Sequence, residues 1–201
     1  MSDLTPTRSV VLELKDERRA MHEGYVFLDE KCLLLAGEIL RELGEYDALQ
    51  AELLAAQVAA IAALQAAVAR HGLEGLQVHP AGSLADGDVR RRLRPLMGVR
   101  LQDVTWEGGA PGPSPAPLDR STEAEACRSA FLDLIGRAAR LAAIAGNLER
   151  LSAEYRRAVR RARALQDVLL PELDSTVYDL ESRLEELEQE DAIWTRQRRP
   201  A

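Results

Sequence analysis

The chain has 201 residues, of which 46% are hydrophobic and only 4% aromatic, and its formal net charge is −7. So few aromatic residues argue against a thick globular core, and an acidic balance argues against a general nucleic-acid binder, which needs a dominant positive field. No apolar run approaches the eighteen or so residues that a membrane span requires, and the N-terminus lacks a signal-peptide pattern, so we expect a soluble cytoplasmic protein.

The first segment, residues 1–72, is predicted to be one long helix. Thr5 can cap it and Pro6 can open it, because proline at the first helical position lacks a donor that the helix could not have used. Gly72 is a plausible stop. Apolar residues recur in alternating steps of three and four, with only Arg18 breaking the series, which is the pattern of a heptad seam. The seam residues are Val11, Leu14, Met21, Tyr25, Leu28, Cys32, Leu35 and Ile39.

The middle segment, residues 73–120, changes character. Leu76–Val78 and Gly98–Trp106 are rich in β-formers, and Ala81–Gly87 between them is turn-like, so we expect a small hairpin or a compact head. Pro111–Pro117, P-G-P-S-P-A-P, predicts an extended linker. A role for this run as an SH3-type ligand is the weaker interpretation, because no basic anchor flanks it closely.

The last segment, residues 121–201, is predicted to be a second long helix that starts at Thr122, with Glu125 completing a capping box, and ends at Gln197. A periodic pattern longer than about 25 residues is typical of a coiled coil. Pro171 interrupts it, and a proline inside a helix removes a hydrogen bond and costs about 3 kcal/mol. Because the apolar spacing resumes after it, we expect a kink at Pro171 and not an end. The resuming residues are Leu173, Val177, Leu180, Leu184 and Leu187.

Two helices of matching length, each with one apolar stripe, most simply pair with each other. The predicted fold is therefore all-α, a long antiparallel two-helix coiled coil with a small β-hairpin-containing middle region. If the two termini lie level, Cys32 lies opposite the region of Glu172 and Cys127 opposite Gln77, too far apart for a disulfide. We expect both to be free thiols in the seam, which fits a reducing compartment.

Sequence signatures of catalysis are missing. The chain has no phosphate-binding loop, no dinucleotide fingerprint, no H-E-x-x-H and no nucleophile elbow. Gly108, Gly109 and Gly112 lie in a proline linker and not before a helix, so they do not predict a phosphate site. The three histidines show no metal-ligand spacing. We therefore predict no catalytic, cofactor-binding or metal-binding residue, and no cofactor.

Four motifs in the same order resemble those of the D subunit of the rotary V-type and A-type ATPases. Pro6–Lys15, P-T-R-S-V-V-L-E-L-K, is similar to the family's opening P-T-R-x-x-L-L-x-L-K, and Gly24 falls where the family has a helical glycine. Met97–Arg100, M-G-V-R, resembles the central M-G-V-[KR]. Arg160–Leu173, R-R-A-R-A-L-Q-D-V-L-L-P-E-L, is similar to R-R-V-N-A-L…I-P-x-L.

The resemblance implies the central-stalk rotor subunit, a shaft with no chemistry of its own that couples ATP hydrolysis or synthesis in a catalytic hexamer to proton or sodium transport in the membrane sector. The implied partners are the catalytic and regulatory subunits of the head, the small companion F subunit of the central stalk, and a funnel-shaped socket subunit above the membrane ring. Its implied location is cytoplasmic, peripheral to the membrane, without direct membrane insertion. Implied contacts with the hexamer are Thr7, Arg8, Val11, Leu12, Leu14, Lys15, Ile193, Trp194 and Arg196.

An arginine cluster, consisting of Arg156, Arg157, Arg160, Arg161 and Arg163, has two interpretations. It can present a basic face to the companion subunit or to the head. It can also form interhelical ion pairs with Glu38, Glu42, Glu45 and Asp47, which the level register places opposite. The alternative function for the whole chain is a prefoldin-like coiled-coil chaperone or scaffold, which also joins two long helices through a small β region.

Overall fold

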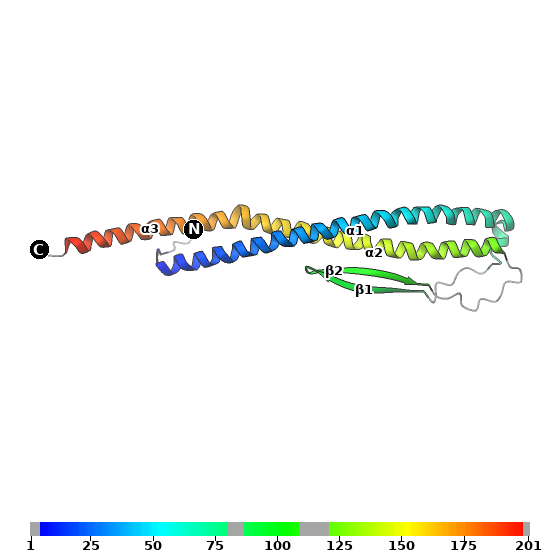
Figure 1. Ribbon diagram of the computed structural model, residues 1–201, viewed down its shortest axis with the longest axis horizontal. Helices are drawn as coiled ribbons and strands as arrows, with labels where there is room; N and C mark the ends of the chain where they lie inside the picture. Colours follow the sequence, from blue (N-terminus) through cyan, green and yellow to red (C-terminus); the bar gives the residue numbers. More distant parts are fainter. Residues whose placement is uncertain (1–4, 80–86, 109–120, 199–201) are drawn as a thin grey trace. The chain divides into compact units, whose positions relative to one another are not determined.

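The computed structural model describes residues 5–79, 87–108 and 121–198 of the chain (Figure 1). Contacts divide the chain into two compact units, residues 1–34 with 155–201 and residues 35–154. In both units the first helix, α1, packs against the C-terminal helical segments, and a small two-stranded antiparallel sheet belongs to the second unit. The predicted fold class is confirmed, and the predicted boundaries at residues 72 and 120 stay predictions.

Helix α1 spans Arg8–Leu76. Its N-cap is Thr7, whose Oγ1 accepts a hydrogen bond from the backbone N–H of Val10 at 3.4 Å. The predicted cap at Thr5 is therefore wrong, because the local threonine nearest the first helical residue satisfies the free amide. At Gly72 the backbone leaves helical geometry, with a φ of 70°, so the expected interruption is present and a short helical stretch follows it.

The predicted seam of α1 is buried. Val11, Cys32 and Leu35 are inaccessible or nearly so, and the other predicted positions are half-buried. The same alternation of three and four continues past Ile39 to Ala67. The further seam positions are Glu42, Tyr46, Leu49, Leu53, Ala56, Ala60, Ala63 and Ala67. A heptad repeat therefore organises the whole of α1, with alanine replacing larger residues in its last third.

The C-terminal segment comprises α2, Thr122–Ala164, a five-residue π-helical turn η1, Leu165–Leu169, and α3, Leu170–Gln197. The N-cap of α2 is Ser121, whose Oγ accepts a hydrogen bond from Ala124 N–H at 3.2 Å. The predicted capping box of Thr122 and Glu125 is thus wrong by one residue. Ser121 also lies 2.6 Å from His71 Nε2, so this cap is tied to the end of α1.

The π turn explains how the helix accommodates Pro171. The amide of Leu170 bonds to the carbonyl of Leu165, five residues back, which inserts one residue relative to an α turn. The burial of side chains shows the same spacing of five residues. Leu165 and Leu170 are both half-buried, whereas Val168 and Leu169 between them are exposed. Pro171 follows this π turn as the second residue of α3. The kink predicted at Pro171 stays a prediction.

The sheet is a hairpin of β1, Asp88–Leu96, and β2, Val99–Glu107. Leu96 pairs with Val99, so the loop is only Met97–Gly98, and both have positive φ, 45° and 85°. This is the conformation of a two-residue type I′ turn, in which glycine is favoured at the second position. The M-G-V-R motif is therefore the hairpin turn and the start of β2, with Val99 buried.

The strand prediction was half correct. Gly98–Trp106 matches β2, whereas Leu76–Val78 is the end of α1 and a turn. Strand β1 was missed because all its residues except Arg94 and Leu96 are exposed, so it lacks the apolar alternation that marks a half-buried strand. The turn predicted at Ala81–Gly87 lies outside the described residues except for Gly87, and the linker Pro111–Pro117 lies outside them entirely.

Part of α1 is more apolar than we expected. The helix contains an 18-residue window long and apolar enough, by length and composition, to cross a membrane, and only 11% of that window is buried. The expectation that no segment approaches this length was wrong, because the alanines count as apolar and glutamines do not break the window. The two cysteines, Cys32 and Cys127, are buried and free, as predicted.

Candidate functional site

The helices pair antiparallel within each unit, but not in the level register. In the first unit Lys15 Nζ lies 2.5 Å from Glu181 Oε1, whereas level termini would place it opposite Gln189, about two turns away. In the second unit Arg137 Nη1 lies 3.1 Å from Glu52 Oε2, and level termini would have placed Glu52 opposite Ser152. The level register was therefore wrong, and the positions that it gave for Cys32 and Cys127 were wrong with it.

The residues predicted to contact the hexamer lie in the first unit and fall into three groups. Thr7 caps α1, while Arg8 and Lys15 form ion pairs with Glu188 and Glu181 of α3. Two apolar residues of α1 face the seam, Val11 being buried and Leu14 half-buried. The exposed members are Leu12, Ile193, Trp194 and Arg196. Thr7, Arg8 and Lys15 are exposed as well, so Val11 and Leu14 are the members of the set that face the seam.

The arginine cluster is exposed on the helix that carries it. Arg156, Arg157, Arg160, Arg161 and Arg163 are all exposed, and the seam residues between them, Ala158 and Ala162, are buried. Glu38 and Glu42, which the level register placed opposite this cluster, have other partners in the second unit. The ion pairs with the arginines and a partner-contact role for the cluster both stay predictions.

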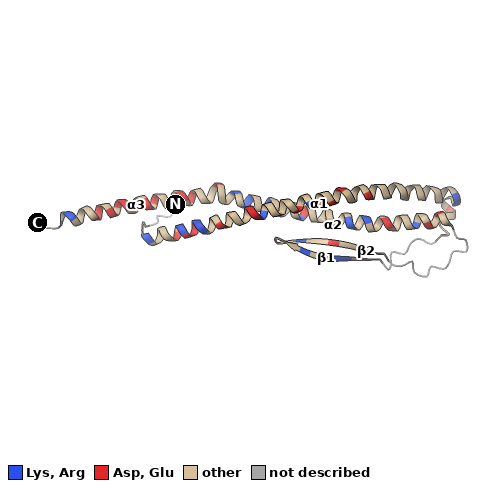
Figure 2. Ribbon diagram, viewed as in Figure 1, with Lys and Arg blue, Asp and Glu red and all other residues tan. Residues whose placement is uncertain are grey.

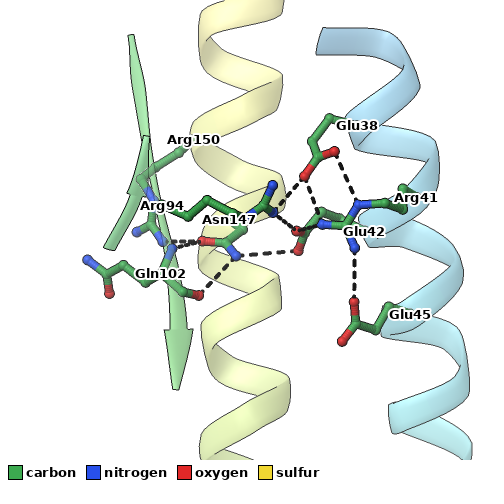
Figure 3. Close-up of polar contacts among 8 residues, drawn as sticks. All are labelled: Glu38, Arg41, Glu42, Glu45, Arg94, Gln102, Asn147 and Arg150. Carbon is green, nitrogen blue, oxygen red and sulfur yellow. Dashed lines mark hydrogen bonds and ion pairs between the residues drawn. The ribbon is translucent and has the colours of Figure 1, made fainter. Parts of the chain in front are cut away.

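A buried polar site lies in the second unit, where α1, α2 and the hairpin meet (Figure 3). Glu42 occupies a seam position of α1 and is only 2% exposed. Burying a carboxylate is costly unless it is paired and hydrogen-bonded. Its Oε1 accepts hydrogen bonds from Arg41 at 2.5 Å and from Arg94 at 3.0 Å, and its Oε2 accepts one from Asn147 Nδ2 at 3.3 Å.

Arg94 connects β1 to α1. Its guanidinium donates to Glu38 Oε1 at 2.6 Å as well as to Glu42, so one side chain of the hairpin bridges two carboxylates one turn apart. Arg41 donates to Glu38 at 2.7 Å and to Glu45 at 3.4 Å. Hydrogen bonding by Arg41, with a smaller contribution from Arg94, lowers the pKa of Glu38 to about 2 although its partial burial acts in the opposite direction. The carboxylate of Glu38 is thus held in its charged form.

Asn147 connects β2 to α2. Its side chain is 1% exposed, its Oδ1 accepts a hydrogen bond from Gln102 N–H at 2.8 Å, and its Nδ2 donates to Gln102 C=O at 3.0 Å. A carboxamide presents the same donor and acceptor as a peptide group, so Asn147 acts as one residue of a third strand at the outer edge of β2. Arg150 donates to the same Oδ1 at 2.7 Å.

The far end of the hairpin is fixed by Trp106. This indole contacts Gly136 of α2, where an added Cβ would lie 3.5 Å from it. It also lies against Gly87 and Gly108, which flank the two strands, and a Cβ at Gly87 would overlap with the ring. Figure 1 shows the hairpin beside α2, and a groove of about 900 Å³ lies between β2 and the two helices.

The arrangement holds the hairpin against α1 and α2. Its charges are paired with one another, and among residues 5–79, 87–108 and 121–198 no group of three or more His, Cys, Asp or Glu side chains could hold a metal ion. Sequence reasoning singled out Glu38, Glu42 and Glu45 but did not connect them with Arg94 and Asn147, and it followed the seam only to Ile39. One further step places Glu42 at a seam position, and a carboxylate in that place is a signal of a buried polar contact.

Comparison with known proteins gives a consistent result. The sequence profile of the family described as the D subunit of ATP synthase matches residues 10–196. The V-type ATP synthase D subunit of Thermotoga neapolitana is 27% identical over 191 residues, which cover 94% of this chain and 93% of the relative. The A-type ATP synthase D subunit of Pyrococcus furiosus is 28% identical over 188 residues, covering 92% and 88%. That of Thermococcus kodakarensis is 26% identical over 191 residues, covering 94% and 89%.

Proposed function

The chain belongs to the ATP synthase D-subunit family, and we propose that it is the central rotor shaft of a V/A-type ATPase or ATP synthase. The observation that carries the proposal is the family match over residues 10–196, which includes both long helical segments and the hairpin. The same match favours this function over the prefoldin-like chaperone.

A shaft must resist bending and twisting, and the seam supplies that property within each unit. Seam positions recur along α1 in steps of three and four from Val11 to Ala67, with charged residues among them at Arg18 and Glu42, and ion pairs join the two helices beside the seam. The cross-helix pairs of the first unit are Arg8–Glu188, Lys15–Glu181 and Arg18–Asp174. Exposed pairs of this kind contribute little stability, about 0 to 1 kcal/mol each, but they favour one register over others.

In the proposed mechanism the chain has no chemistry of its own. Catalytic sites in the hexamer close and open in turn as ATP is hydrolysed, and each state packs best against one angular face of the shaft, so the shaft turns. In synthesis, proton or sodium flow through the membrane sector turns the shaft and drives the sites in reverse. The chain would be cytoplasmic and peripheral to the membrane, as part of the complex.

Each proposed partner is assigned to one group of predicted contact residues. The exposed residues Leu12, Ile193, Trp194 and Arg196 would turn inside the hexamer of catalytic and regulatory subunits, where apolar contacts make a bearing that salt does not weaken. The exposed arginines Arg156, Arg157, Arg160 and Arg161 would face the head or the companion F subunit. The second unit, with its hairpin, would approach the funnel-shaped socket subunit.

Trimming both ends of the chain tests the bearing. A variant lacking residues 1–7 and 193–201 should still assemble with the hexamer, whereas ATP-driven ion transport per ATP hydrolysed should fall. A truncated chain that fails to enter the hexamer would mean that the ends anchor the protein. Full coupling by the truncated chain would mean that they do not bear on the head.

A further inference from the structure

Helix α1 carries a second apolar stripe that faces solvent within the second unit. It consists of Leu54, Val58 and Ile61, which are 55%, 69% and 46% exposed. Steps of four and three place them on one face of the helix. Val58 is two residues from each of the seam residues Ala56 and Ala60. At about 100° per residue, this separates it from them by about 200° around the helix. The stripe therefore lies on the side of α1 opposite to the seam.

This part of α1 contains no charge at all. Residues 53–69 include no Asp, Glu, Lys or Arg, and in Figure 2 the corresponding stretch of α1 is uniformly tan. A helix that is hydrophobic all round is ordinarily buried in a protein or in a membrane. Contiguous exposed apolar surface marks an interaction site. Since α2 covers only the seam side, the stripe lacks a cover among the residues that the structure describes.

Charged residues beside the stripe favour a protein over a bilayer as that cover. Alongside the apolar stretch, Arg137 of α2 binds both Glu52 and Asp133, and Arg70 binds Glu123 where the stretch ends. If α1 entered a bilayer here, α2 would have to enter with it. Its charged residues would then lie in hydrocarbon, where each of them is strongly unfavourable.

We propose that the stripe is the docking surface for an amphipathic helix of a neighbouring protein of the complex, whose contact face is apolar and carries a lysine or arginine opposite Asp47. The inference rests on the proposed function and specifies the surface that one partner uses. A stripe with alternating steps of four and three fits side chains of a second helix that repeat in the same way.

Two features of α1 specify the partner helix further. Alanines border the stripe on one side, at Ala51, Ala55 and Ala62, and small residues allow helix axes to approach to about 8 Å. Asp47 is exposed and lies on the same face, two helical turns before Leu54. Its carboxylate would be left unpaired by a wholly apolar partner, so a cation opposite it fixes the direction and register of docking.

Photo-crosslinking in the assembled complex tests the proposal. The chain would carry p-benzoylphenylalanine at Val58 or, as the control, at Ala66, which is exposed on another face of the same uncharged stretch. We expect the Val58 probe to crosslink to one non-identical subunit, within a helical peptide whose contacts repeat every three or four residues. We expect the Ala66 probe to give little of that product. A Val58 product with a second copy of the chain, with lipid, or with no protein of the complex would overturn the proposal.

A charge substitution provides the second measurement. In Val58→Glu, the carboxylate would enter an apolar interface without a partner, so we expect retention of the crosslinked subunit to fall about tenfold or more. Ala66→Glu should retain it, and circular dichroism should show unchanged melting for both variants. Equal retention by both variants would overturn the proposal, as would binding of the purified chain to phosphatidylcholine and phosphatidylglycerol vesicles that Val58→Glu abolishes. If the wild-type chain failed to co-purify with ATPase subunits at all, the proposed function itself would fail.

Discussion

The side-chain amide of Asn147 pairs with both backbone polar groups of Gln102, at 2.8 and 3.0 Å, and so completes the outer edge of β2 from a helix. A two-stranded hairpin is marginally stable by itself. Its attachment to α2 through Asn147 and to α1 through Arg94 therefore explains how so short a sheet holds its place in the second unit.

Replacing Asn147 with leucine should destabilise the hairpin. The change keeps the volume but leaves the N–H and C=O of Gln102 and one oxygen of Glu42 without their partner, at a cost of about 1 to 3 kcal/mol for each buried unsatisfied group. Hydrogen exchange should show faster exchange of the Gln102 amide. Gln102→Ala is the matched control, because Asn147 binds the backbone of Gln102 and not its side chain. Equal protection in wild type and Asn147→Leu would contradict this view.

Acid should loosen the hairpin through Glu38. Because its folded pKa of about 2 lies below the ordinary value of 4.5, its contribution to stability is fully present above about pH 4.5 and is lost as the pH falls toward 2. Thermal melts between pH 5 and pH 3 should fall more steeply for wild type than for Glu38→Gln, which has no proton to bind at that position. Parallel pH dependence of the two proteins would show that Glu38 is not the responsible group.

Glycine at position 87 is required by the indole of Trp106. In Gly87→Ala the new Cβ would overlap with the ring, and overpacking of this kind costs about 1 to 3 kcal/mol. At Gly136 the added Cβ would make an ordinary contact at 3.5 Å, and alanine is favoured over glycine in a helix by about 0.8 to 1 kcal/mol. In a Trp194→Phe background, urea melts followed by Trp106 fluorescence should shift down for Gly87→Ala and up or not at all for Gly136→Ala. A downward shift of similar size in both would contradict this account of the packing.

In the first unit, replacing a seam residue should lower stability, whereas replacing a surface arginine should affect assembly with partners and leave stability nearly unchanged. Leu180 is buried in the seam, so Leu180→Ala should cost about 2 to 4 kcal/mol, whereas Arg157→Ala at an exposed position should cost less than about 1 kcal/mol. Circular dichroism melts would measure the first effect, and binding to the reconstituted hexamer and companion subunit would show whether the arginine change weakens assembly. Comparable melting losses in the two variants would mean that Arg157 is part of the fold and not of a docking surface.

The sequence predicted the parts of the structure that repeat. The steps of three and four from Val11 to Ile39 identified the seam of α1, and the apolar spacing from Leu173 onward correctly predicted that the helix resumes after Pro171. Strand β1 has no such pattern, since a strand attached at one arginine needs no apolar face. The register was missed because heptads slide past one another by whole turns at little cost in apolar contact. Ion pairs such as Lys15–Glu181 distinguish one register from the next, but periodicity reflects only the apolar positions and not these charged side chains.

For the predicted hexamer contacts, too, periodicity predicted some features of the structure and the family motif did not. Periodicity assigned Val11 and Leu14 to the seam and did not include Leu12, and the structure buries Val11, half-buries Leu14 and exposes Leu12. The family motif contains all three without distinguishing their faces. Asn147 could not be predicted from sequence, because its partner is backbone and any residue of β2 offers the same two groups.

Rotation of the chain inside the hexamer is the central claim, and single-molecule observation tests it most directly. A cysteine introduced at the exposed Arg92 of β1 would carry a bead, while the native Cys32 and Cys127 are buried and react slowly. With the hexamer fixed to a surface, we predict stepwise rotation in one direction that starts with ATP and stops when ATP is removed. A bead that stays still while the same complexes hydrolyse ATP in a coupled manner would contradict the account.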